Sequence, residues 1–170
     1  ALGADHATHL YNAMPFFTHR APGVIGAAHD SSHVMVELIT DGVHIHPSVV
    51  RTTFDMFKDR VVLISDSMRA TGMPDGQYTL GGQAVTVKGN MATLIEGGAL
   101  AGSVTNLMDC MRNAVKNMGI SLEDAVAAAT INPAKSVGLD NKYGSIKQGK
   151  VGNLVLLDQN LEIQKVILNG

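Results

Sequence analysis

The chain has 170 residues, with 13 basic and 15 acidic side chains and a formal charge of −2. The near balance, with no Lys/Arg run, argues against a nucleic-acid-binding surface but is compatible with a small anionic ligand. The single cysteine, Cys110, excludes an internal disulfide, and no leader or membrane-length apolar run is visible. We therefore expect a cytoplasmic protein of one domain, or one domain plus an appendage, that contacts neither nucleic acid nor membrane.

All seven histidines lie between His6 and His46, so the first third of the chain is chemically dense. The chain begins at Ala1, without a methionine, and enters patterned sequence at once. This start suggests a piece of a longer polypeptide.

Two apolar, β-branched runs, residues 34–39 and 61–64, are each followed by polar, ionisable residues. The β-branched runs at 34–39 and 61–64 are typical of buried parallel strands, and 7–10 is compatible with the end of another. Residues 47–60 have helical spacing and a plausible start at Pro47. The pattern predicts an α/β fold with its reactive residues at the carboxyl ends of neighbouring strands.

The rest of the chain is predicted to form a glycine-punctuated β-hairpin within residues 73–100, then three helices and two terminal strands. We expect Ser103 to cap the first helix, whose apolar stripe of Val104, Leu107, Met108, Met111, Val115 and Met118 ends at Gly119. Ser121 with Asp124 forms a capping box for residues 122–130, and Pro133 is expected to open the last helix. The terminal strands, 153–158 and 165–168, are too few to form a core of their own.

His9, His44 and Asp66 are the candidates for chemistry, because each follows a predicted strand. An imidazole at a strand end is a natural ligand for zinc or iron, and an aspartate beside a metal-activated water can carry a proton to a leaving amine. The three residues therefore point to metal-assisted hydrolysis. Their spacing alone is a weak signal, because the sequence contains no HExxH pattern and one histidine with one aspartate does not fill a coordination sphere.

Structural roles are the alternatives for the same polar residues. His6, His29 and His33 would be solvated surface histidines. His46, Asp41 and Asp66 would be helix caps, the favoured interpretation of Asp41 taken alone.

Two further alternatives concern Asn12 and Cys110. Asn12 would satisfy backbone groups in a turn before Pro15. Cys110 and most of the nine methionines would serve packing.

Several longer strings are more specific than this spacing. "ATHLYNAMPFFTHRAPG" (7–23), "ITDGVHIHP" (39–47), "LISDSM" (63–68), "LAGSVTNLMDCMRN" (100–113) and "GSIKQGKVGNLVLLD" (144–158) occur in this order. In this respect the chain resembles the N-acetylglucosamine-6-phosphate deacetylases of the amidohydrolase superfamily over essentially its whole length. The last string is common among amidohydrolases, whereas "THLYNAM" with "DGVH" and the aspartate strand end carries the resemblance.

The resemblance implies a (β/α)8 metallohydrolase that converts N-acetylglucosamine 6-phosphate to glucosamine 6-phosphate and acetate in amino-sugar catabolism and cell-wall sugar recycling. Residues 1–140 would be the C-terminal part of the barrel, and 141–170 the C-terminal strands of a small β-sandwich domain. His9 would bind a divalent metal, zinc or iron, with one or two ions per full-length subunit. Asp66, beside the metal, would be the general base and then the acid, and His44 would orient or polarise the acetamide carbonyl.

The resemblance also implies a substrate pocket. Asn12 and Ala13 would meet the phosphate, and Arg20 would reach the phosphate in the partner subunit of a homodimer. The rigid donor fork of arginine suits that role. Asp41, Gly42 and Val43 would contact the substrate with His44, while Leu100, Ala101 and Gly102 would line the sugar site, where glycine permits close backbone approach.

Members of this family have an N-terminal half with a metal-binding glutamate and a further histidine, and this chain lacks that half. We therefore expect the 170 residues alone to be inactive and metal-poor. An open barrel would also expose a strand edge and apolar surface, which predicts self-association.

Two alternatives stay open at this stage. One is another amidohydrolase, dihydroorotase-like or adenine-deaminase-like, for which phosphate-directed Asn12, Ala13 and Arg20 would make little sense. The other is a truncated, non-catalytic module kept for folding or partner binding.

Overall fold

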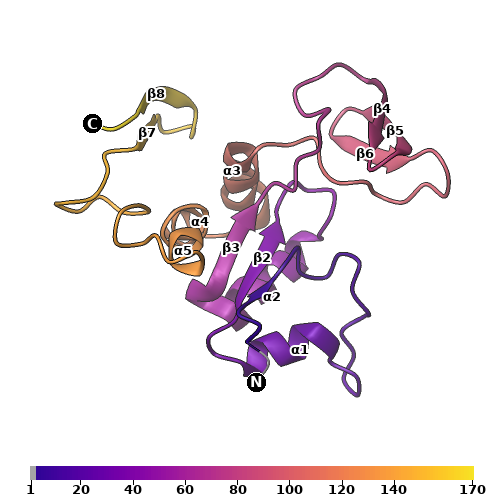
Figure 1. The fold of residues 1–170 in the computed structure, drawn as a ribbon, viewed down its shortest axis with the longest axis horizontal. Helices are drawn as coiled ribbons and strands as arrows, with labels where there is room; N and C mark the ends of the chain where they lie inside the picture. Colours follow the sequence, from indigo (N-terminus) through magenta and orange to yellow (C-terminus); the bar gives the residue numbers. More distant parts are fainter. Residues whose placement is uncertain (1–2) are drawn as a thin grey trace.

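The computed structural model describes residues 3–170, and a parallel sheet lies at its centre (Figure 1). Strands β1 (His6–Ala7), β2 (Met35–Ile39) and β3 (Val61–Ile64) pair in the order β1-β2-β3. Glu37 of β2 is in register with Val62 of β3. The predicted strands at 34–39 and 61–64 are therefore confirmed as parallel neighbours, and the carboxyl ends of all three strands share one edge. The strand end predicted at 7–10 is only partly confirmed, because β1 ends at Ala7 and residues 8–10 form a turn.

Helices connect these strands and cover one face of the sheet. Helix α1 (Gly23–Asp30) follows β1, and α2 (Pro47–Phe57), continued by the 3-10 turn η1 (Lys58–Arg60), joins β2 to β3. Val36, Leu38, Val61 and Leu63 pack toward the helices with Val50, Phe54 and Phe57 of α2. Because side chains alternate along a strand, Glu37 points to the opposite face.

The N-terminus of α2 is capped by His46, whose side chain accepts a hydrogen bond from the Ser48 N–H at 3.2 Å. The capping role considered for His46 is confirmed. The same role for Asp41 is wrong, because this helix begins after His46. For Asp66 it is also wrong, since the next element after β3 is a strand.

The glycine-punctuated region forms an antiparallel meander of β4 (Gly76–Leu80), β5 (Gln83–Lys88) and β6 (Met91–Leu94). The predicted hairpin is confirmed, with a third strand added. Val85, Val87, Ala92 and Ala101 are buried in a second, smaller core.

Helix α3 (Leu107–Met118) begins later than predicted. Its cap is Asn106, whose side chain accepts from the Asp109 N–H at 2.9 Å, so the prediction that Ser103 caps this helix is wrong. Ser103 Oγ is engaged elsewhere, with the Ser65 carbonyl oxygen. Gly119 ends the helix with a φ of 79°, as predicted.

The buried face of α3 also differs from the predicted stripe. Val104 precedes the helix and Leu107 is exposed. The fully or nearly buried side chains are those of Cys110, Met111, Ala114 and Met118. The packing role of Cys110 is confirmed.

Two short helices and two strands complete the chain. Ser121 caps α4 (Leu122–Ala129) by accepting from the Asp124 N–H, as predicted, and its hydroxyl donates to the Asp124 carboxylate. Helix α5 (Ile131–Ser136) starts before Pro133, so Pro133 does not open it. Strands β7 (Leu154–Leu157) and β8 (Ile163–Ile167) form a separate antiparallel pair.

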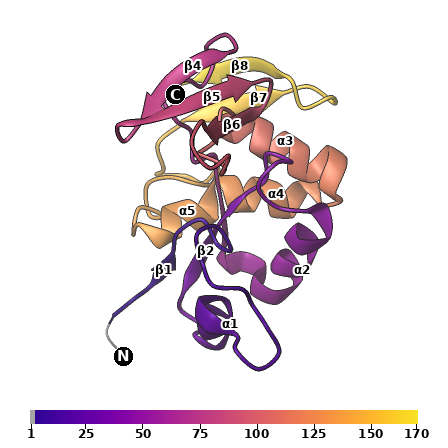
Figure 2. The ribbon, with the colours of Figure 1, turned by 90° about the vertical axis from the view of Figure 1, so that its right-hand side faces the viewer.

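The two antiparallel sheets lie on opposite sides of the molecule in Figure 1, and both lie above α3 and α4 in Figure 2. The parallel sheet remains open: residues 3–170 form no closed barrel. No helix in this range has the length and apolar character needed to cross a membrane.

Candidate active site

His9 and Asp66 occupy equivalent places at the carboxyl edge of the parallel sheet, each the second residue after its strand. Both have left-handed backbone conformations, with φ values of 34° for His9 and 50° for Asp66. Such values are uncommon for non-glycine residues and store backbone strain, which clusters at functional sites. His44 lies in the loop after β2, so the sheet brings all three predicted catalytic positions to one edge.

The His9 imidazole is half-buried and carries an unusual ring nitrogen. Its Nδ1 is the one buried side-chain nitrogen or oxygen among residues 3–170 that has no hydrogen-bond partner. A buried polar atom without a partner is costly, whereas a neutral imidazole nitrogen is a good metal ligand. The atom therefore fits a metal, although no three His, Cys, Asp or Glu side chains of the described range gather to hold one.

Glu37 fixes the segment that carries His9, a role that the sequence prediction missed. Its carboxylate is bonded to His6 Nε2 at 2.9 Å and accepts the His9 backbone N–H at 3.1 Å. Its backbone carbonyl accepts the Leu10 N–H at 2.8 Å. His6 is thus a half-buried partner of Glu37, and the prediction of a solvated surface histidine is wrong, whereas His29 and His33 are exposed as predicted. The available signal was an acidic residue inside an apolar strand.

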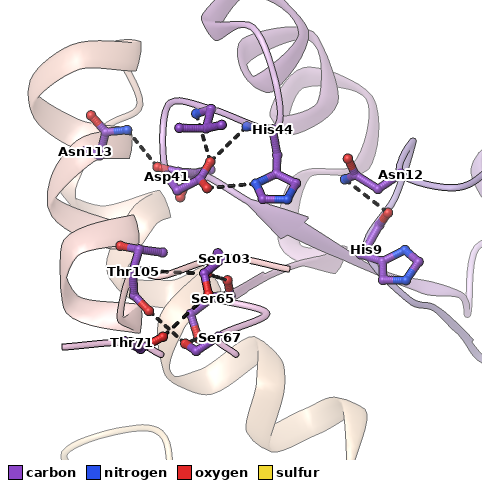
Figure 3. A network of polar contacts seen from close by, with 12 residues as sticks. His9, Asn12, Asp41, His44, Ser65, Ser67, Thr71, Ser103, Thr105 and Asn113 are labelled. Carbon is purple, nitrogen blue, oxygen red and sulfur yellow. Dashed lines mark hydrogen bonds and ion pairs between the residues drawn. The ribbon is translucent and has the colours of Figure 1, made fainter. Parts of the chain in front are cut away.

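The "DGVH" loop contains a closed carboxylate–imidazole pair (Figure 3). Asp41 Oδ2 and His44 Nδ1 are 2.7 Å apart, and Asp41 Oδ1 accepts the backbone N–H groups of Val43 and His44 at 2.9 and 3.0 Å. Burial by itself would raise the pKa of Asp41, but the hydrogen bonds from His44 and Val43 and the attraction of His44 outweigh it, so the pKa is lowered. Asp41 is therefore held as a carboxylate against His44.

Helix α3 is hydrogen-bonded to Thr40, the residue before this loop. Asn113 Nδ2 donates to the Thr40 carbonyl oxygen at 2.8 Å, and the buried Thr40 hydroxyl donates to the Cys110 carbonyl oxygen at 2.8 Å. Gly42, with a φ of 84°, passes so close that an added Cβ would lie 3.0 Å from Asn113 Nδ2. The sequence prediction missed Thr40 and Asn113 as supports, because nothing in their local pattern indicates a contact between β2 and α3.

Asp66 is supported by the segment before α3. The Ser103 N–H donates to the Asp66 carbonyl oxygen at 2.9 Å, and the Met68 N–H donates to the Ser103 carbonyl oxygen at 2.8 Å. The Asp66 side chain is exposed and makes no hydrogen bond within the described residues. An exposed carboxylate on a fixed backbone is available for proton transfer.

Of the three predicted sugar-lining residues, Gly102 lies against Asp66. Its φ is 66°, and a Cβ there would be 3.3 Å from the Asp66 carbonyl oxygen. Ala101 is buried in the second core and Leu100 is 40% exposed. The close approach that the structure shows at Gly102 is to a neighbouring strand end, and the approach of a sugar to this residue stays a prediction.

The residues assigned to the phosphate follow His9 in a tight turn and loop. Asn12 Nδ2 donates to the His9 and Leu10 carbonyl oxygens at 3.4 and 3.3 Å, which confirms its role in the turn. Ala13 is exposed with a φ of 55°. Arg20 is exposed and forms no ion pair or hydrogen bond within residues 3–170, in a loop where Phe16 is 90% exposed.

At the carboxyl edge of an open parallel α/β sheet, the described residues therefore place an unpartnered imidazole, a carboxylate–imidazole pair and an exposed carboxylate. The model of the Amidohydrolase family matches residues 1–170. The chain belongs to the amidohydrolase family.

The chain is similar to several N-acetylhexosamine-6-phosphate deacetylases. It is similar to the N-acetylgalactosamine-6-phosphate deacetylase of Escherichia coli O157:H7, with 40% identity over 99% of this chain and 44% of the relative. It is 41% identical to the N-acetylglucosamine-6-phosphate deacetylase of Bacillus subtilis, over 99% of this chain and 42% of that relative. A relative from Escherichia coli K12 is 40% identical over 95% of this chain and 96% of its own length. The chain thus spans under half of the first and second of these relatives and nearly all of the third.

A solved structure shares this fold. It is a mutant N-acetyl-D-glucosamine-6-phosphate deacetylase from Mycobacterium smegmatis in complex with N-acetyl-D-glucosamine-6-phosphate. The TM-score is 0.90 at 36% identity, covering 99% of this chain and 45% of that one. The described residues therefore have the arrangement of less than half of that enzyme.

Proposed function

We propose that this chain forms the C-terminal part of a deacetylase that hydrolyses N-acetylglucosamine 6-phosphate to glucosamine 6-phosphate and acetate. The observation that carries the proposal is the buried, unpartnered Nδ1 of His9, placed on the same sheet edge as Asp66 and His44. The ligand named for the Mycobacterium smegmatis complex supports the choice of sugar.

The fold supports a related proposal about the domains to which these residues belong. We assign residues 1–140 to part of a (β/α)8 barrel and 141–170 to strands of a small β domain. The open sheet β1-β2-β3 and the separate β7-β8 pair both lack the neighbours that a barrel and a β-sandwich would supply.

A divalent metal, zinc or iron, would be held here by His9 and Asp66 together with ligands from outside the chain. When bound, such a metal polarises the amide and lowers the pKa of water. The metal ligands would have to be completed from elsewhere, so the isolated chain is expected to bind metal poorly and to show little activity.

The residues of this chain would then divide the work. The Asp66 carboxylate takes a proton from the attacking water and returns it to the departing amine, which is a poor leaving group without it. His44 orients the acetamide carbonyl. Asn12, the backbone of Ala13 and the Arg20 guanidinium bind the phosphate, with Arg20 acting on the partner subunit of a homodimer.

A second substrate has its own support. One relative at 40% identity is an N-acetylgalactosamine-6-phosphate deacetylase, so the galactosamine epimer is the alternative within the same reaction. The two sugars share the acetamide and phosphate that the proposed residues recognise.

The experiment is a chimera in which this chain replaces the matching part of the Bacillus subtilis enzyme. Acetate release is measured from both sugar phosphates and from N-acetylglucosamine without phosphate. We expect the chimera to prefer N-acetylglucosamine 6-phosphate, and the His9→Ala and Asp66→Asn chimeras to be inactive, with a loss of at least about 100-fold. A folded, metal-loaded chimera that deacetylates neither sugar phosphate would refute the proposal, and preference for galactosamine would establish the alternative.

A further inference from the structure

The Asp41–His44 pair is more buried and more fully hydrogen-bonded than a side chain that only contacts a substrate would have to be. The Asp41 side chain is 2% exposed and that of His44 is 6% exposed. Both Asp41 oxygens are already occupied: Oδ1 by two backbone N–H groups and Oδ2 by the His44 ring. Little of the Asp41 carboxylate is left to bind a ligand.

The hydrogen bond to Asp41 determines which ring nitrogen of His44 carries the proton. Since an ionised carboxylate only accepts hydrogen bonds, the proton between Asp41 Oδ2 and His44 must lie on Nδ1. In neutral His44 the other nitrogen, Nε2, is then an acceptor, and it becomes a donor only in the imidazolium form. No hydrogen bond occupies Nε2 within residues 3–170.

We propose that Asp41 is a positioning residue for His44, which it holds in one orientation as the Nδ1–H tautomer, and that α3 fixes Asp41 through Asn113 and Thr40. The inference rests on the proposed function for the role of His44. Two hydrogen bonds join α3 to the residue before Asp41. The Thr40 hydroxyl donates to the Cys110 carbonyl oxygen, and Asn113 Nδ2 donates to the Thr40 carbonyl oxygen.

The proposal changes what His44 is expected to do. A neutral His44 accepts from a donor at Nε2, such as a sugar hydroxyl or the amide N–H. It donates to the acetamide carbonyl oxygen only in the imidazolium form, in which both ring nitrogens carry protons. Asp41 would thereby set the state in which His44 meets the substrate.

The test uses this chain, labelled with ¹⁵N in its histidine rings, and long-range ¹H–¹⁵N spectra that report which ring nitrogen carries the proton. In the native chain, at a pH where His44 is neutral, we expect the Nδ1–H tautomer in at least about tenfold excess, as a charge-assisted hydrogen bond requires. An excess of the Nε2–H tautomer would overturn the proposal without any variant.

Asp41→Asn is the informative variant, because the amide oxygen can still accept the Val43 and His44 backbone N–H groups. The group that faces Nδ1 becomes an NH2 donor, so we expect the proton to move to Nε2 while the two backbone amides stay protected from hydrogen exchange. Asp55→Asn, the same change at an exposed position on α2, is the matched control and should leave the His44 signals unchanged.

The outcomes separate this inference from the proposed function. If Asp41→Asn leaves the tautomer unaltered with the amides protected, Asp41 does not position His44, whatever the chimera hydrolyses. If the tautomer changes as expected and the chimera is inactive on both sugars, the positioning role stands and the proposed reaction fails. In an active chimera, Asp41→Asn should lower kcat at least about tenfold with a smaller change in KM, a split that a purely structural defect would not produce.

Discussion

Removal of the Glu37 carboxylate should lower the free energy of unfolding, because this side chain is bonded to two groups of the β1 segment. In Glu37→Ala the His6 ring and the His9 N–H lose their shared acceptor, and both lie at a site that water reaches poorly, since the Glu37 side chain is 20% exposed. Hydrogen bonds to a charged group contribute about 1.5–3 kcal/mol each, and partial exposure reduces this. We expect the free energy of unfolding to fall by about 2–4 kcal/mol for Glu37→Ala and by about 1 kcal/mol for Glu37→Gln, which keeps an acceptor oxygen.

The assay is urea unfolding of the purified chain, followed by circular dichroism and near-ultraviolet absorbance. Glu96→Ala is the matched control, because Glu96 is exposed and has no hydrogen-bond partner within the described residues, and it should change stability by less than about 0.5 kcal/mol. A double-mutant cycle with His6→Ala should give a coupling of about 0.5–2 kcal/mol. The reasoning fails if Glu37→Ala is no more destabilising than Glu96→Ala, or if the cycle shows no coupling.

Three further predictions follow from the same region. The pKa of Asp41 is lowered from 3.8, so its ionised form stabilises the fold above that value and the contribution is lost as the pH falls through the folded-state pKa. Between about pH 5 and 3 the urea midpoint should therefore drop more for the native chain than for Asp41→Asn, and parallel curves would refute this. Burial raises the pKa of Cys110 to about 11, so a thiol reagent at neutral pH should label Cys110 only after unfolding, and rapid labelling of the folded chain would contradict it. Gly102→Ala should lower the melting temperature more than Gly98→Ala: both positions have left-handed φ, but only Gly102 has a neighbour, the Asp66 carbonyl oxygen, within 3.4 Å of the added Cβ. An equal decrease in melting temperature for the two variants would show that the Asp66 carbonyl oxygen does not restrict a side chain at position 102.

Local pattern was sufficient for the elements that position the site. The apolar runs at 34–39 and 61–64 predict β2 and β3 because buried parallel strands have that composition, and the polar residues after them then fall on one edge. The cap formed by Ser121 could also be predicted, since Ser121 and Asp124 are only three residues apart in the sequence. These features depend on residues close together in the chain.

The supports of the site were not predictable in the same way. Glu37 lies 31 residues from His6, and Asn113 lies 73 residues from Thr40. Ser103 and Asn106 are both good helix caps by type; in the structure Ser103 Oγ donates to the Ser65 carbonyl oxygen, and Asn106 accepts the Asp109 N–H at the start of α3. Such pairings depend on which elements become neighbours, and a single sequence contains no direct signal for that.

Each predicted catalytic or metal-binding residue at the sheet edge is held by an element other than the one that carries it. His9 after β1 is fixed by Glu37 of β2, the loop of His44 is fixed by α3, and the backbone of Asp66 after β3 is fixed by Ser103. The left-handed backbone of His9 and Asp66 can persist because these neighbours over-determine it. The backbone positions of the proposed site residues therefore depend on contacts within residues 3–170. Changes to Glu37, Asn113 or Ser103 should then affect function through the positions of His9, His44 and Asp66, even though none of the three supports needs to touch the substrate.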